Sequence, residues 1–106
     1  MTRSIPGIHH VTAISGPPQP NVDFFTGRLG QRLVKKTVNF DAPDTYHLYY
    51  GDAAGSPGTI LTFFPFADAG SGRAGPGMAS AYAYAVPKGG FDAWMGRLAE
   101  DAVDFE

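Results

Sequence analysis

The side chains of this chain best suited to chemistry are its three histidines, His9, His10 and His47. Imidazole changes charge near neutral pH and is the commonest metal ligand in proteins, so these residues suit acid–base work or metal binding. His9 and His10 are adjacent, and His47 lies between two tyrosines in residues 46–49. Cysteine is absent, which excludes disulfides, thiolate metal sites and cysteine nucleophiles.

Other functional classes find little support in the sequence. Ser4 and Ser15 have no Asp–His relay around them, which argues against a serine hydrolase. Residues 70–75 are glycine-rich but lack the Lys-Ser/Thr ending of a phosphate loop. The chain has 8 basic and 10 acidic residues, and its longest apolar runs are far too short to cross a bilayer. The N-terminus lacks the apolar segment of a signal peptide. We therefore expect a cytoplasmic protein with no nucleic-acid or membrane partner.

The histidine pair lies in a predicted strand over residues 7–15, where β-branched residues precede the breaker Gly16-Pro17-Pro18. Side chains alternate between the two faces of a strand. One face would carry Ile8, His10, Thr12 and Ile14, and the other His9, Val11 and Ala13.

The elements after this strand form a regular succession. The spacing of Val22, Phe25 and Leu29 predicts a helix over 20–29, ended by Gly30. Gly27 inside this helix predicts that another element approaches closely there. Three strands are predicted next, over 32–40, 45–50 and 59–64, with a turn-rich loop at 51–58. The order β-α-β-β-β predicts an α+β fold.

The rest of the chain repeats the beginning of this succession. Residues 91–98 share Asp, Gly, Arg and Leu with residues 22–29 at matching positions, and the alternating run 78–86 predicts a strand before them. We predict a first βαβββ module at 5–66, a linker at 67–77, and the truncated start of a second module at 78–106. The unfinished second sheet predicts either a shortened polypeptide or a homo-oligomer, including a strand-swapped dimer.

Several runs of the sequence, in this order and spacing, resemble one protein family. They are Gly7-Ile8-His9-His10-Val11-Thr12, Val22-Asp23-Phe24-Phe25, residues 33–40, Tyr46-His47-Leu48-Tyr49-Tyr50 and residues 55–65. The chain resembles the N-terminal part of the hydroquinone-type ring-cleaving (extradiol) dioxygenases. These belong to the glyoxalase/bleomycin resistance/dioxygenase, or vicinal oxygen chelate, superfamily, which is built from paired βαβββ modules.

The resemblance implies a metal-dependent enzyme. Family members hold Fe(II), with Mn(II) as the alternative metal, through two histidines and one glutamate, and they open hydroquinone- or catechol-like rings with dioxygen. By position the first ligand is His10, and the other two ligands have no counterpart in this chain. We therefore expect the 106-residue chain alone to be inactive. No further catalytic residue is identified.

Five other residues are candidates for supporting the metal ligand or lining a substrate pocket: His9, Thr12, His47, Tyr82 and Tyr84. For His9, packing on the opposite strand face is favoured, with a role beside the metal as the alternative. His47 is equally compatible with a pocket and with a hydrogen-bonded sheet histidine. Tyr82 and Tyr84 could line a pocket, although packing beneath a helix is favoured. Phe63, Phe64, Phe91 and Trp94 are predicted in the core.

Two other functions stay open at this point. One is a non-catalytic small-molecule binding module of the bleomycin-resistance type, which the shortage of metal ligands in this chain favours. The other is a glyoxalase-type metal-dependent lyase or isomerase assembled across a dimer. The run 59–64 lacks the carboxylate that many superfamily members carry on their fourth strand, so the lyase is the least favoured.

Overall fold

A computed structural model describes residues 3–38, 45–101 and 103 of the chain. The chain divides into two compact units, Met1–Gly70 and Ser71–Glu106. The last two residues of the strand predicted over 32–40 lie outside the described residues.

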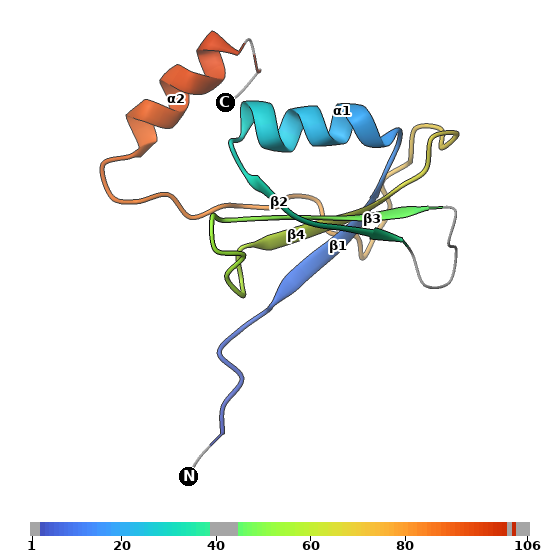
Figure 1. The fold of residues 1–106 in the computed structure, drawn as a ribbon, viewed down its shortest axis with the longest axis horizontal. Coiled ribbons are helices and arrows are strands. Elements are labelled where there is room, and N and C mark those ends of the chain that lie inside the picture. Colours follow the sequence, from blue (N-terminus) through green and yellow to red (C-terminus); the bar gives the residue numbers. More distant parts are fainter. Residues whose placement is uncertain (1–2, 39–44, 102, 104–106) are drawn as a thin grey trace. The chain divides into compact units, whose positions relative to one another are not determined.

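The first unit is built on one mixed sheet of four strands (Figure 1). The strands are β1 (His10–Ser15), β2 (Arg32–Val38), β3 (Tyr46–Gly51) and β4 (Ile60–Pro65). Their spatial order is β1-β4-β3-β2, with β1 parallel to β4 and the other neighbours antiparallel. The predicted βαβββ order and the α+β fold are confirmed.

One helical segment connects β1 to β2 and lies over one face of the sheet (Figure 1). It begins as α1 (Pro18–Val22) and continues as a π-helical turn, η1 (Asp23–Arg28). Proline suits a first turn because its missing N–H would have no partner there, so the helix starts earlier than predicted. Gly30 follows with φ +66°, a conformation that glycine adopts without strain. The close approach predicted at Gly27 is wrong, because a Cβ built there would meet no described atom of another element within 4 Å.

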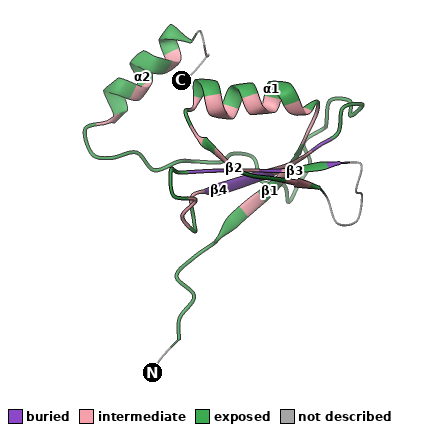
Figure 2. Cartoon of the chain, in the orientation of Figure 1, coloured by how far each residue is buried: buried purple, intermediate pink, exposed green. Residues whose placement is uncertain are grey.

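The core lies between this helical segment and the sheet. Burial is concentrated in β3 and β4 (Figure 2), where Leu48 is 1% and Tyr50 0% exposed. Phe25 of η1 lies on two aromatic rings of the sheet, with its ring centroid 4.9 Å from that of Tyr50 and 5.0 Å from that of Phe63. The Tyr50 hydroxyl donates a 2.7 Å hydrogen bond to Asn21 Oδ1, so its buried polar tip is satisfied.

The burial of Tyr50 predicts a loss of stability at alkaline pH. Burial, together with the negative charge of Asp23, raises the pKa of Tyr50 to about 12 from its ordinary value of 10.0. The folded state therefore holds this proton more tightly than the unfolded state does. The resulting stabilisation is complete below pH 10 and should be lost as the pH rises from about 10 to about 12. Urea unfolding across this range, compared with Tyr50→Phe, measures it. Parallel curves for the two proteins would contradict the prediction.

The second unit contains one described helix, α2 (Phe91–Glu100). The strand predicted over 78–86 is wrong, because the structure shows no strand within the described residues of this unit. A strand needs a partner for its backbone groups, and the alternating pattern alone does not supply one. Phe91 is 64% exposed and is not a core residue here, whereas Trp94 is half-buried under the Arg97 guanidinium.

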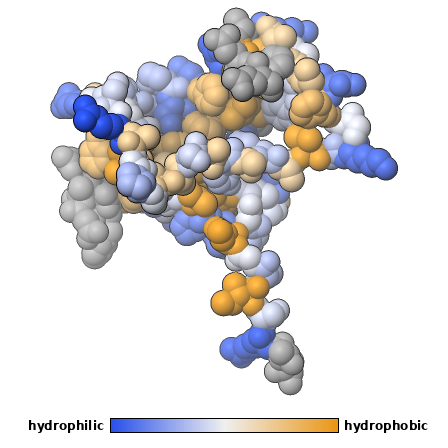
Figure 3. Space-filling view, turned by 180° about the vertical axis from the view of Figure 1, so that it is seen from behind, coloured by the Kyte–Doolittle hydropathy of each residue, from blue (hydrophilic) through white to orange (hydrophobic). Residues whose placement is uncertain are grey.

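Apolar side chains stand in solvent along the extended N-terminal segment before β1 (Figure 3). Ile5 and Ile8 are the two most exposed large hydrophobic residues described, at 91% and 74%. Among the described helices, none has the length and apolar character required to span a bilayer.

Candidate functional site on the open face of the sheet

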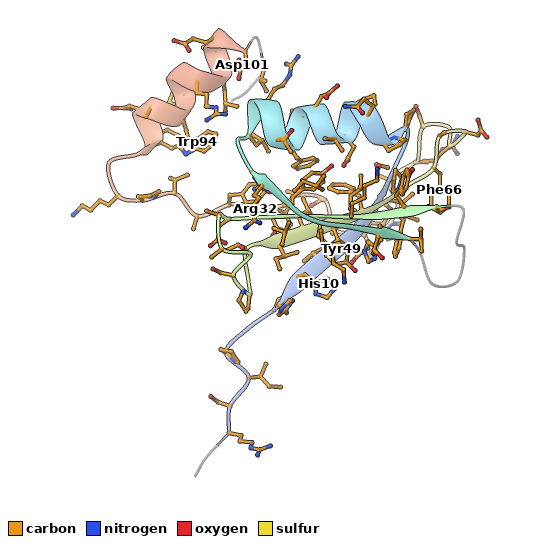
Figure 4. All side chains as sticks on the ribbon, in the orientation of Figure 1. His10, Arg32, Tyr49, Phe66, Trp94 and Asp101 are labelled. Atoms are coloured by element: carbon orange, nitrogen blue, oxygen red, sulfur yellow. The ribbon has the colours of Figure 1, made fainter. Side chains whose placement is uncertain are left out.

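Polar and titratable side chains gather on the sheet face opposite the helical segment, which we call the open face. Figure 4 shows His10 and Tyr49 on this side of the sheet. The register places Thr12 of β1 beside Thr62 of β4, and Thr62 beside Tyr49 of β3. Side chains alternate along each strand, so this face also carries Ile14, Lys35, Thr37, His47 and Phe64. The predicted shared face of His10, Thr12 and Ile14 is confirmed, and Phe64 lies here, not in the core.

The two adjacent histidines are in contact with each other. Their rings are perpendicular with centroids 5.2 Å apart, and a 3.0 Å hydrogen bond joins His9 Nδ1 to His10 Nδ1. Both residues are exposed. The alternation predicted for residues 7–15 fails at His9 because β1 begins only at His10. His9 therefore does not pack on the helix side of the sheet.

A chain of hydrogen bonds crosses the open face over three strands. Tyr49 hydroxyl and His47 Nδ1 are 2.8 Å apart, and His47 Nε2 lies 3.0 Å from Thr62 Oγ1. Thr62 Oγ1 lies 2.7 Å from Thr12 Oγ1. We call these four residues, Tyr49, His47, Thr62 and Thr12, the hydroxyl–imidazole chain. His47 is thus a hydrogen-bonded sheet histidine that also belongs to the candidate site.

The surroundings of His47 favour its neutral form. Its ring stacks on Phe64 with centroids 4.0 Å apart. Burial lowers the pKa of His47, and the positive charges of His10 and then Lys35 lower it further. Lys35 Nζ lies 5.4 Å from the centre of the Tyr49 ring. A neutral imidazole has one N–H donor and one lone pair, so each of its two hydrogen bonds has a defined direction.

The structure brings some of the predicted residues together and not others. His9 touches His10, while Thr12 and His47 are joined through Thr62. Tyr82 and Tyr84 belong to the second unit, where their rings contact each other at 4.9 Å and both are 39% exposed. Neither packs beneath a helix as a buried residue.

Thr62, which is 0% exposed, was missed in the sequence. The alternation within 59–64 could have placed it on the face of His10, but its partners depend on strand register.

The described residues do not form a complete metal site. A catalytic metal needs several histidine or carboxylate ligands converging on one point. Among residues 3–38, 45–101 and 103, no group of three His, Asp or Glu side chains is close enough to hold an ion. His10 could supply one ligand. The described part of the chain cannot supply the set.

Relatives with curated descriptions match almost the whole chain. A Bacillus subtilis protein named "Putative ring-cleaving dioxygenase MhqO" is 53% identical over 105 residues, which are 99% of this chain and 34% of that protein. A Sphingobium indicum protein named chlorohydroquinone/hydroquinone 1,2-dioxygenase is 45% identical over 101 residues, or 93% of this chain and 32% of that protein. The chain thus spans about a third of the length of the curated relatives it matches. No family model matches it.

Solved structures agree with this relationship. The crystal structure of a putative dioxygenase from Bacillus subtilis is 55% identical with a TM-score of 0.89, covering 94% of this chain and 32% of that one. The fosfomycin resistance protein FosX of Listeria monocytogenes shares the fold alone, at 14% identity and a TM-score of 0.65, with 97% of this chain and 73% of that one covered. The predicted βαβββ module of the vicinal oxygen chelate fold is confirmed, and both solved structures share it. Over almost its whole length, the chain is similar to about one third of the length of proteins named as ring-cleaving dioxygenases, as its resemblance predicted.

Proposed function

We propose that this chain is part of an Fe(II)-dependent dioxygenase that cleaves hydroquinone- or catechol-like rings. The observation that carries the proposal is the 53% identity, over 99% of the chain, to a protein named as a ring-cleaving dioxygenase. Mn(II) is the alternative metal, and it is the ion bound in two structures of the fold relative FosX. A hydroxylated aromatic and dioxygen are the substrates.

His10 is the metal ligand that this chain contributes. It is exposed at the start of β1, where its Nδ1 is engaged by His9. A ligating histidine typically donates its second ring N–H to a neighbouring acceptor, which fixes its tautomer. With His9 as that acceptor, the Nε2 lone pair of His10 is free for a metal. Two histidines and one carboxylate leave open positions on iron for substrate and dioxygen, and the remaining ligands come from outside the described residues.

An edge strand offers a place for the missing part of the site. β1 lies at one end of the sheet order and pairs with β4 alone among the described strands. Its other edge can accept a further strand, either from the rest of a longer polypeptide or from a second copy. Ligands carried by such an added sheet would approach the open face beside His10.

Oxygen uptake by the protein at its native length tests the proposed activity. The protein, loaded anaerobically with Fe(II), is mixed with hydroquinone and isotopically labelled dioxygen. We expect one dioxygen consumed per ring, with both labelled oxygen atoms in a ring-opened product. Uptake should disappear when the metal is removed by a chelator and return when Fe(II) is added back.

A metal-free binding module is the second candidate, and the lack of a complete ligand cluster among the described residues favours it. It predicts that the chelated protein still binds hydroquinone by calorimetry while consuming no oxygen with any metal. That combination would contradict the dioxygenase.

A further inference from the structure

The direction of hydrogen bonds along the hydroxyl–imidazole chain depends on one proton of His47. Thr62 is fully buried, and its hydroxyl lies between His47 Nε2 and Thr12 Oγ1. A hydroxyl has one proton, so Thr62 can donate to only one of these neighbours. If Nε2 carries the imidazole proton, Thr62 accepts it and donates to Thr12. If Nδ1 carries it, Thr62 donates to Nε2 and Thr12 must donate to Thr62.

Tyr49, at the other end of the hydroxyl–imidazole chain from Thr12, selects between these two arrangements. Among the four residues of the hydroxyl–imidazole chain, Tyr49 alone carries a phenol, and a phenol is far more acidic than an aliphatic hydroxyl, which makes it the better donor. Tyr49 therefore donates to Nδ1 of His47. The proton of the imidazole then lies on Nε2 and points to Thr62, which in turn donates to Thr12. The Thr12 hydroxyl accepts the hydrogen bond from Thr62, so its own proton is not used within the hydroxyl–imidazole chain.

We propose that His47 is a positioning residue that, held between Tyr49 and Thr62, leaves the Thr12 hydroxyl as a hydrogen-bond donor directed onto the open face near His10. Thr12 and His10 are two residues apart in β1 and therefore share this face. A free donor at this position suits an oxygen atom that carries partial negative charge, such as that of a phenolic ring bound beside His10. The phenolic substrate in this role rests on the proposed function. The direction of the hydrogen bonds along the hydroxyl–imidazole chain does not depend on it.

The arrangement around His47 is rigid enough to hold such an orientation. Both ring nitrogens are engaged, and the ring is stacked on Phe64. The polar side-chain atoms of His47 and Thr62 are all engaged, and satisfied polar contacts of this kind specify one arrangement of these two side chains. Neither His47 nor Tyr49 needs to touch a substrate to act, because each works through Thr62.

A double-mutant cycle in the protein at native length tests whether His47 acts through Thr12. We expect Thr12→Val and His47→Leu each to lower kcat/KM for hydroquinone about 10- to 100-fold, as removal of supporting groups commonly does. The double variant should be no slower than the slower single variant, because the two residues form one unit. Thr37→Val is the matched control. Thr37 is the cross-strand neighbour of His47 and lies on the same open face, but it is not a member of the hydroxyl–imidazole chain. Thr37→Val should lower kcat/KM less than threefold, and in the Thr37→Val, His47→Leu double variant the two fold-losses should multiply. Losses that multiply in the Thr12→Val, His47→Leu double variant would overturn the proposal.

The tautomer of His47 gives a second readout that needs no activity. Nitrogen NMR of protein with isotope-labelled histidine should show a proton on Nε2 and a lone pair on Nδ1. Tyr49→Phe should weaken this preference, and Thr37→Val should leave it unchanged. A proton on Nδ1 would overturn the orientation. If the wild-type protein consumes no oxygen with hydroquinone, the proposed function fails by itself, and the NMR result still decides how His47 orients Thr12.

Discussion

His10→Ala in the protein at native length is expected to abolish the proposed metal binding and the proposed ring-cleaving activity. His10 is the one residue of this chain that the resemblance assigns as a ligand, and it lies exposed on the open face. Groups that merely support a ligand cost about 10- to 100-fold when removed, so loss of the ligand itself should exceed about 100-fold in kcat/KM. Metal content after dialysis, measured by elemental analysis, and oxygen uptake with hydroquinone are the two readouts.

His9→Ala is the matched control, because it removes the same side chain from the neighbouring position. It should retain the metal, with weaker binding since His10 loses its Nδ1 partner. His10 is exposed, so its alanine variant removes little packing, and the unfolding midpoint should stay close to that of the wild type. Metal retained in His10→Ala and lost in His9→Ala would move the assignment to His9. Metal retained in both would contradict a ligand role for the pair.

The order of elements in the first unit could be read from the sequence because each signal was local. Breakers such as Gly16-Pro17-Pro18 bounded the strands, and alternation along β1 placed His10 and Thr12 on one face. The prediction failed at His9 because β1 begins only at His10 and nothing in the alternating pattern marks that boundary. It also failed over 78–86, since a period of two describes a strand's faces but not its partner.

The candidate site was predictable only in part because its contacts join residues far apart in sequence. Thr12 and Thr62 are 50 positions apart, and only the parallel register of β1 and β4 brings their hydroxyls together. A one-residue slip of either strand would turn its side chain to the other face. The His47–Tyr49 contact is different, because residues two apart on a strand always share a face. That pair could have been predicted from sequence, whereas the partners of Thr62 could not.

Tyr50→Ala is expected to unfold the first unit or to leave it barely stable. Tyr50 is 0% exposed and its ring stacks on Phe25, so alanine would open a cavity between the helical segment and the sheet. Loss of a buried aromatic ring typically costs about 3–5 kcal/mol, which is comparable to the lower end of a small domain's total stability of about 5–15 kcal/mol. Chemical denaturation followed by circular dichroism measures the change in unfolding free energy.

Tyr50→Phe separates the contribution of the ring from that of the hydroxyl. It keeps the stacking on Phe25 but removes the 2.7 Å hydrogen bond to Asn21. The expected cost is about 1 kcal/mol, the usual net value of one hydrogen bond. If the two variants lost equal stability, the hydroxyl–Asn21 bond, and not ring packing, would hold the helical segment against the sheet. A large loss confined to Tyr50→Ala identifies the aromatic stack as the support beneath β3, whose other face carries His47 and Tyr49.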